Sequence, residues 1–272
     1  MSDDLNFPSD LYILQSVLKA IDSNHQLFLI NSNNGITIDH QDVEKIIDDD
    51  TALVSLSHVA FKSAFMYDME VITSLAHSRG ALMLWDLSHS AGIVPIHLNK
   101  CRVDLAIGCT YKYLNGGPGA PAFLYVRKEL QKQLDSPIWG WFGDKSPFQF
   151  DLQYRPSESI QKFLIGTPPV LSLSAVEPGV DLLLGAGMKR IREKSIRQTE
   201  YAIFLIQQFL QPLGFEIGSP LAYQIRGSHI ALRHVEAYRI CQALIDPDVG
   251  DFIVIPDFRA PDHIRLGFSP LY

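Results

Sequence analysis

The sequences ALMLWDLSHSAG at residues 81–92 and VDLAIGCTYKYLNGGPGA at residues 103–120 decide the fold. Each begins with a short, continuous apolar run, 81–85 and 103–107, which is typical of a strand buried on both faces. Polar residues follow each run, and Asp86 directly follows the first. Because ligands of an open parallel sheet gather at the carboxyl ends of its strands, these following residues are candidates for a functional site.

The same alternation of apolar runs and helical patterns continues on both sides of this region. Ser9 and Asp10 are suited to capping a helix that carries apolar residues at helical spacing. The pattern predicts helices that run from Ser9 through at least Leu18, over 39–47 and over about 68–78, and further strands over 27–30, 52–56 and 122–126. We therefore expect an α/β fold, with a mostly parallel sheet covered by helices on both faces.

The second half of the chain has a different sequence pattern from the first. Residues 136–159 are rich in proline, glycine and aromatic residues, so they form either a binding or lid segment or a packed surface loop. Residues 170–210 are helical in pattern with a break near Gly185 and Gly187, and short strands with one helix near 234–245 follow. We predict two partial domains, a large α/β domain over residues 1–185 and a smaller C-terminal α+β domain over residues 186–272.

The composition and motifs of the chain argue against several classes of protein. Among 272 residues, 47% are hydrophobic and 19% charged, which is typical of a globular protein with a sizeable core. The formal charge of -7 argues against nucleic acid, and no apolar run reaches the ~18 residues of a membrane span. Three cysteines without a paired spacing and a start without a signal peptide favour a reducing, cytoplasmic location. The histidines have no metal-ligand spacing, and the glycines at 116–119 do not match the dinucleotide fingerprint.

Lys112 and Asp86 form the pair with the clearest chemical meaning. Lys112 follows an apolar run and precedes a glycine-rich loop, where its amine is available to form a Schiff base. Pyridoxal phosphate needs such a lysine for its aldehyde and a carboxylate against its pyridine nitrogen. From these residues alone, a surface lysine and a helix-capping aspartate remain an equally simple interpretation.

The motifs around this pair closely resemble those of kynureninase, a fold-type-I pyridoxal phosphate enzyme of the aminotransferase class-V type. The resemblance rests first on the two segments quoted above. It continues in order through NFPSDLY at 6–12, GWFG at 140–143, GTPP at 166–169, RGSH at 226–229 and IRLGFSPLY at 264–272. It spans essentially the whole chain.

The resemblance implies a role for each matching position. Lys112 is the Schiff-base lysine, Asp86 the partner of the pyridinium nitrogen, and Tyr111 a second proton carrier. Further cofactor contacts fall at Phe7, which stacks on the ring, and at Pro8, Ser9, Asp10, Ser57 and His89, while Tyr111, Trp141 and Thr167 hold the phosphate. The substrate is bordered by Arg265, which grips its α-carboxylate as a bidentate fork, and by His58 and Gly166.

The resemblance also implies a reaction and a partner. Kynurenine or 3-hydroxykynurenine is hydrolysed to anthranilate or 3-hydroxyanthranilate and alanine, within tryptophan catabolism and NAD biosynthesis, by a homodimer in which some phosphate contacts cross the interface. Two alternatives stay open: another fold-type-I activity such as a cysteine desulfurase or aminotransferase, and a non-catalytic remnant.

The chain departs from the family pattern in four places. Kynureninases carry a long N-terminal part with further phosphate-binding residues, and a C-terminal helix, so the resemblance implies a chain shortened at both ends. Alanine occupies position 64, where the family tends to have glycine, and residues 246–256 form a longer connection than usual. We expect sheet edges and apolar faces to be left uncovered.

Overall fold

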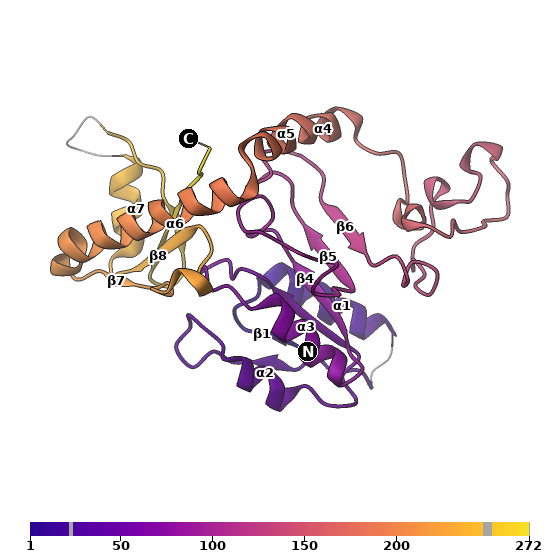
Figure 1. The fold of residues 1–272 in the computed structure, drawn as a ribbon, viewed down its shortest axis with the longest axis horizontal. Coiled ribbons are helices and arrows are strands. Elements are labelled where there is room, and N and C mark those ends of the chain that lie inside the picture. The colour runs from indigo at the N-terminus through magenta and orange to yellow at the C-terminus, as the bar shows by residue number, and fades with distance from the viewer. Residues whose placement is uncertain (22–23, 247–251, 272) are drawn as a thin grey trace.

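Two four-stranded sheets organise the computed structural model, which describes residues 1–21, 24–246 and 252–271 (Figure 1). The first sheet has the order β3-β4-β5-β6, formed by Leu53–Ser57, Leu82–Asp86, Leu105–Gly108 and Phe123–Val126. Strands β3, β4 and β5 are parallel, and β6 pairs antiparallel with β5. The predicted α/β fold with a mostly parallel sheet is therefore confirmed.

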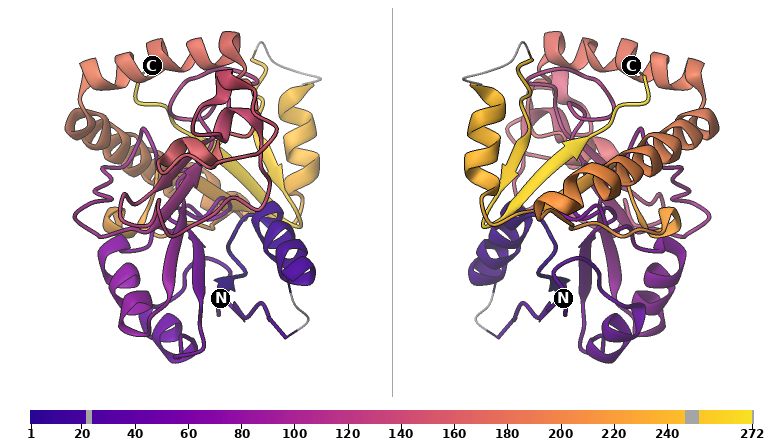
Figure 2. Two further views of the ribbon diagram at one scale, coloured as in Figure 1. Left: turned by 90° about the vertical axis from the view of Figure 1, so that its right-hand side faces the viewer. Right: turned by 90° about the vertical axis from the view of Figure 1, so that its left-hand side faces the viewer.

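The two faces of this sheet are covered unequally. Helices α2 (His40–Ile46) and α3 (Met69–Ser78) lie on one side of the strands and α1 (Pro8–Ile21) on the other, as Figure 2 shows. On the α2 and α3 side, Met83 and Trp85 are fully buried in the main core. On the α1 side, Leu124 is 41% exposed and α1 buries none of its own residues. Helices thus lie over both faces as expected, and the cover is closer on the α2 and α3 side than on the α1 side.

The N-terminal residues extend the sheet beyond β3. Strand β1 (Ser2–Asp3) pairs in parallel with β2 (Leu29–Ile30), and on its other side the Met1 carbonyl accepts a hydrogen bond from the Ser55 amide at 3.0 Å. The strand predicted over 27–30 is thus confined to its last two residues. Strand β1 lies between β2 and β3.

The second sheet builds the smaller C-terminal unit. It is antiparallel throughout and has the order β7-β8-β10-β9, formed by Glu216–Ile217, His229–Arg233, His263–Gly267 and Asp257–Arg259. Its core combines buried residues of β8 and β10 with those of α6 (Met188–Leu205), η4 (Ile206–Leu210) and α7 (Ala237–Ile245). The predicted α+β character is confirmed, and the domain boundary at 185/186 stays a prediction.

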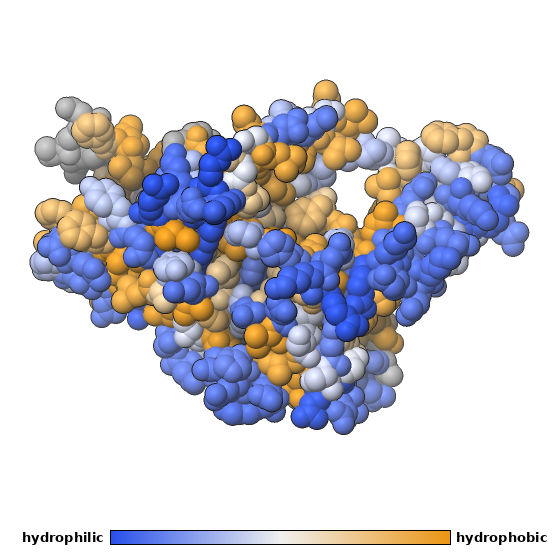
Figure 3. Space-filling view, viewed as in Figure 1, coloured by the Kyte–Doolittle hydropathy of each residue, from blue (hydrophilic) through white to orange (hydrophobic). Residues whose placement is uncertain are grey.

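A long arm leaves the first sheet after β6. It contains only short turns of helix, η1 (Trp141–Gly143), η2 (Pro147–Gln149) and η3 (Ile160–Phe163), before α4 (Val170–Ser174) and α5 (Val176–Ala186) lead back toward the body. Figure 1 shows the arm projecting to one side, and Figure 3 shows an opening between it and the rest of the molecule. The remaining short helices, η5 (Gln211–Leu213) and η6 (Tyr223–Ile225), lie in the smaller unit.

Membrane-spanning potential is weak in the part of the chain that the structure describes. No single helix there is long and apolar enough to cross a bilayer, and the segments 170–186 and 188–213 pass such a test only together, as a pair bent by 83°.

Candidate active site

The end of β4 places Asp86 in a fixed orientation. Its side chain accepts a hydrogen bond from the Ser88 amide at 2.9 Å, and its other oxygen lies 3.3 Å from the Ser57 hydroxyl at the end of β3. The same hydroxyl lies 2.7 Å from the Asn6 side-chain oxygen, which ties both strand ends to the segment before α1. Asn6, which is buried, was missed as a site residue, although it opens the NFPSDLY motif. The predicted carboxylate therefore lies at the carboxyl edge of the parallel strands.

Lys112 lies on a closed loop after β5. The Gly116 amide donates to the Thr110 carbonyl at 2.8 Å, which closes the loop around Lys112, and the Lys112 amine lies 5.4 Å from the centre of the Tyr111 ring. Gly92, with φ +87°, allows the loop to approach, because a Cβ there would lie 2.7 Å from the Tyr113 carbonyl oxygen. Only glycine combines this left-handed backbone with so close an approach. The two quoted motifs therefore hold each other in place.

The first turn of α1 brings a second carboxylate to the same place. The pKa of Asp10 is raised to about 6, chiefly by burial and then by the negative charge of Asp86, while Lys112 opposes both effects. These three charged groups therefore act on one another within one site. Phe7, which precedes α1, is 41% exposed and meets Phe61 edge to face at 5.2 Å between ring centres. Pro8 and Ser9 are exposed in the same turn.

A cleft of about 470 Å³ brings Lys112 against the smaller unit. Lys112, Tyr111 and His89 line it from the first sheet's loops, and Arg265 on β10 lines it from the other side. The site prediction missed eight of its lining residues, of which five are polar: Tyr113, Asn115, His229, Asp257 and Ser269. Of these, His229 ends the RGSH motif, which had no role assigned to its histidine.

Both histidines of the cleft are held neutral. Burial lowers the pKa of His229 to about 3, with the Arg265 charge as the next cause. Burial also lowers the pKa of His89 well below its ordinary value, helped by Lys112, His229 and Arg265. The rings lie 5.7 Å apart between centres, so a proton on one would repel a proton on the other. The two histidines therefore add no positive charge to the cleft.

Arg265 is fixed at the cleft wall. It donates to the Phe61 carbonyl at 2.6 Å, forms an ion pair with Asp257 and lies 3.4 Å from a ring nitrogen of His89. Asp257 also pairs with Arg259 at 3.0 Å. This arrangement makes Arg265 a pre-positioned cation suited to a carboxylate or phosphate ligand.

No other predicted residue lines this cleft, and four of them have different surroundings. His58 is 4% exposed and packs edge to face on Trp85 at 5.6 Å, with burial lowering its pKa to about 4. Trp141 lies in the arm, where its ring stacks on Phe150 at 6.0 Å. Gly166 and Thr167 follow in the same arm, where Thr167 is exposed. None of these four residues lines the cleft in a single copy of the chain, and the roles of all the predicted site residues stay predictions.

Metal chemistry has no support in the described residues, which contain no group of three or more histidine, cysteine, aspartate or glutamate side chains able to hold an ion.

Comparisons with known protein families give two matches. The aminotransferase class-V model matches residues 15–211, and the kynureninase C-terminal domain model matches residues 191–272. Among curated relatives, a protein named kynureninase from Pseudomonas fluorescens is 41% identical over 267 residues, covering 98% of this chain and 61% of the relative. The chain thus spans about three fifths of the length of that relative, and the resemblance to kynureninase drawn from the motifs is confirmed.

Solved structures agree on the fold. An apo cysteine desulfurase from Thermococcus onnurineus NA1 superposes with a TM-score of 0.77 at 18% identity, covering 99% of this chain and 68% of that one. A variant of the enzyme C-DES, with glycine covalently linked to its PLP cofactor, superposes with a TM-score of 0.82 at 15% identity, covering 99% and 69%. At these identities the likeness shows the fold alone, which is the fold-type-I architecture expected from the sequence.

Proposed function

We propose that this chain, which belongs to the aminotransferase class-V family, uses pyridoxal phosphate to hydrolyse L-kynurenine or 3-hydroxykynurenine to anthranilate or 3-hydroxyanthranilate and L-alanine. The observation that carries the proposal is the placement of Lys112, Asp86 and Asp10 in one electrostatically coupled site beside a cleft. Relatives named kynureninase at about 40% identity support the choice of substrate. We place the reaction in the cytoplasm, as a step of tryptophan catabolism and NAD biosynthesis.

The residues present fit the cofactor. Lys112 offers the amine for its aldehyde, and Asp86, held by Ser57 and the Ser88 amide, offers a carboxylate for its pyridine nitrogen. Phe7 is exposed at the same edge and is free to cover the ring. When bound, pyridoxal phosphate supplies an electron sink for charge that develops at the substrate's α-carbon.

The chain's own groups then bind the substrate and move protons. Arg265 holds the substrate's α-carboxylate, a task for which its position against Phe61 and Asp257 prepares it. The Lys112 Nζ removes the α-proton and later returns it, and the Tyr111 hydroxyl, beside it in the cleft, is the second proton carrier. Neutral His89 and His229 add no positive charge that would compete for the carboxylate.

The decisive experiment compares Lys112→Ala with Lys100→Ala, which alters an exposed lysine paired with Glu70. Anthranilate release, followed by fluorescence with kynurenine and added pyridoxal phosphate, should fall at least about a hundredfold for Lys112→Ala and stay unchanged for Lys100→Ala. A Lys112→Ala protein with full turnover contradicts the assignment. Folded wild-type protein that borohydride cannot link to the cofactor would favour the non-catalytic alternative.

We also infer that the partner is a second copy of the chain. The arm that carries Trp141 and Thr167 projects from the body (Figure 1) and exposes large apolar side chains, including Leu152 at 103% and Phe148 at 71%. Such exposure favours an interface, and the arm's distance from its own cleft favours a contribution to the partner's. Mixing inactive Lys112→Ala and Trp141→Ala proteins should restore part of the activity, because one of the two mixed sites then has both residues. Mixtures without any recovery would contradict the shared site.

A further inference from the structure

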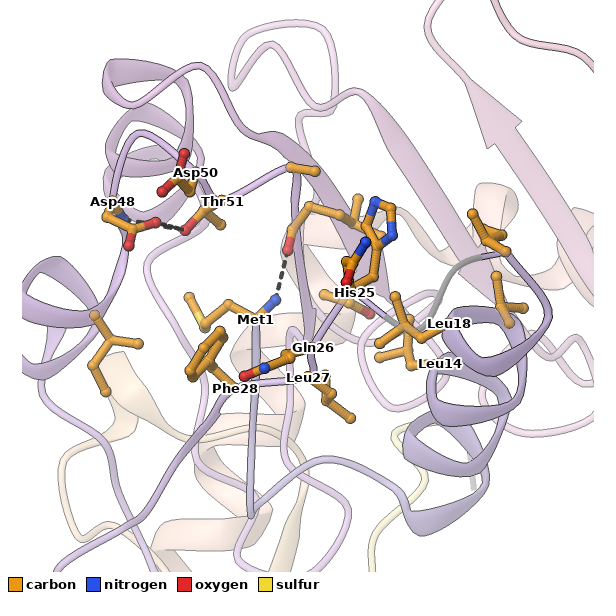
Figure 4. A pocket seen from close by; sticks show the side chains of 17 residues that line it. Met1, Leu14, Leu18, His25, Gln26, Leu27, Phe28, Asp48, Asp50 and Thr51 are labelled. Carbon is orange, nitrogen blue, oxygen red and sulfur yellow. Dashed lines mark hydrogen bonds between the residues drawn. The ribbon is translucent and has the colours of Figure 1, made fainter.

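The cleft beside Lys112 has a positively charged wall, which a larger cavity of the chain lacks. The larger cavity, of about 700 Å³, lies between α1 and the strand ends near Met1 (Figure 4). Most of the described residues that line it are apolar, Asp48 and Asp50 are among the rest, and none of them is a lysine or an arginine. The cleft is lined by Lys112 and Arg265, so it is the better place for a ligand with a carboxylate.

Strands β9 and β10 place three charged side chains on one face of the second sheet. Arg265 on β10 lies directly opposite Asp257 on β9, and Arg259 follows two residues after Asp257. Paired residues, and residues two apart along a strand, share a face of the sheet, so all three lie on the face toward the cleft, which Asp257 and Arg265 line. The alternate residues Phe258 and Ile264 instead belong to the core formed with α6 and α7.

One carboxylate oxygen is shared between the two arginines. Oδ2 of Asp257 forms an ion pair with Nη2 of Arg265 and lies 3.0 Å from Nη2 of Arg259. Arginine stays charged in proteins, so two positive charges meet one negative charge in this group and one positive charge is left over. Burial is the main cause of the lowered pKa of His89, and Arg265 and Arg259 both add to it. Both arginine charges therefore act within the cleft.

We propose that Asp257 sets the charge preference of the cleft: by neutralising one of the two arginine charges, it makes this wall select ligands with one carboxylate over ligands with two. The inference rests on the proposed function, in which Arg265 holds the substrate's α-carboxylate, and it names the substrate class of that site. A single carboxylate binds Arg265 while Asp257 keeps Arg259 paired. A second carboxylate beside the first would be repelled by Asp257 at short range. The selectivity thus comes from a contact that is unfavourable for the wrong ligand.

The test measures the binding of two probes to the full 272-residue chain without pyridoxal phosphate or kynurenine. The probes are 4-phenylbutanoate, which has one carboxylate, and benzylsuccinate, which is the same molecule with a second carboxylate near the first. Dissociation constants come from titrations followed by ligand-observed NMR. Asp257→Asn removes the shared charge. Asp262→Asn is the matched control, because Asp262 pairs with Arg233 of the same sheet at 3.1 Å and does not line the cleft. Circular dichroism checks that each variant folds.

The wild type should bind 4-phenylbutanoate more tightly than benzylsuccinate, and the reverse order overturns the proposal. We expect Asp257→Asn to raise the affinity for benzylsuccinate relative to 4-phenylbutanoate at least about tenfold, and Asp262→Asn to leave this ratio unchanged. Adding Arg259→Gln to Asp257→Asn should return the ratio toward the wild-type value, because one arginine charge is then left over as before.

Equal weakening of both probes by Asp257→Asn would mean that Asp257 only holds Arg265 in place, and it overturns the proposal, as does a folded wild-type chain that binds neither probe. Anthranilate release by the wild type separates this failure from that of the proposed function. Release together with a ratio that Asp257→Asn leaves unchanged would retain the proposed function and exclude the charge preference.

Discussion

Replacing His229 by glutamine should make the stability of the chain less sensitive to acid. His229 is 2% exposed, and burial with Arg265 nearby lowers its pKa from 6.5 to about 3. Below pH 6.5 the unfolded chain binds a proton at this histidine that the folded chain excludes, so stability present above pH 6.5 is lost as the pH falls. At pH 5 the loss from this one residue is about 2 kcal/mol, since each pKa unit corresponds to about 1.4 kcal/mol.

The assay is urea unfolding of the chain at about pH 7.5 and about pH 5. Wild-type protein and His97→Gln, which alters an exposed histidine, should show the full drop in unfolding free energy. His229→Gln should lose about 2 kcal/mol less between the two conditions, whatever its stability at neutral pH. An identical drop in all three proteins would refute the reasoning.

Other buried titratable groups also make the unfolding free energy of the chain depend on pH. The lowered pKa of His58, about 4, adds a loss of the same sign below pH 6.5. The pKa values of Asp3 and Asp10, both raised to about 6, act in the opposite direction, because these carboxyls bind protons in the folded state before the unfolded chain does. These contributions are common to the wild type and both variants, so the difference between variants reports His229 together with its effect on the pKa of neighbouring His89.

Three further changes test the framework of the site. Asp104→Ala should cost about 3 to 5 kcal/mol in urea unfolding, with Asp104→Asn costing less, because this fully buried carboxylate contacts His77, pairs with Arg127 and accepts a hydrogen bond from the Met83 amide. Gly92→Ala should cost about 1 to 3 kcal/mol in thermal unfolding, because its new Cβ would press on the Tyr113 carbonyl. Ser57→Ala should weaken pyridoxal phosphate binding about tenfold, as followed by absorbance, because it removes the hydroxyl beside Asp86. An unchanged unfolding free energy for Asp104→Ala would contradict the first argument. An unchanged melting temperature for Gly92→Ala would contradict the second, and an unchanged pyridoxal phosphate affinity for Ser57→Ala would contradict the third.

The sequence alone predicted the features that depend on local hydrophobic pattern and on the residues at strand ends. The apolar runs at 81–85 and 103–107 became parallel neighbours, and their following residues placed Asp86 and Lys112 in one site. The substitution at Ala64 also has a structural counterpart, since its φ of 64° lies in the left-handed region that glycine prefers. These features depend on short segments and on the rule that parallel strands share a carboxyl edge.

What the sequence could not predict depends on distant contacts. The position of His58 at a strand end did not indicate that its ring turns to Trp85 instead of the cleft. The motif containing Trp141 did not indicate that the segment after β6 would project to one side of the body (Figure 1). Asp257 follows the connection at 246–256, and its pairing with Arg265 requires β9 and β10 to be aligned. In each case the side-chain environment is set by tertiary packing, which no local pattern encodes.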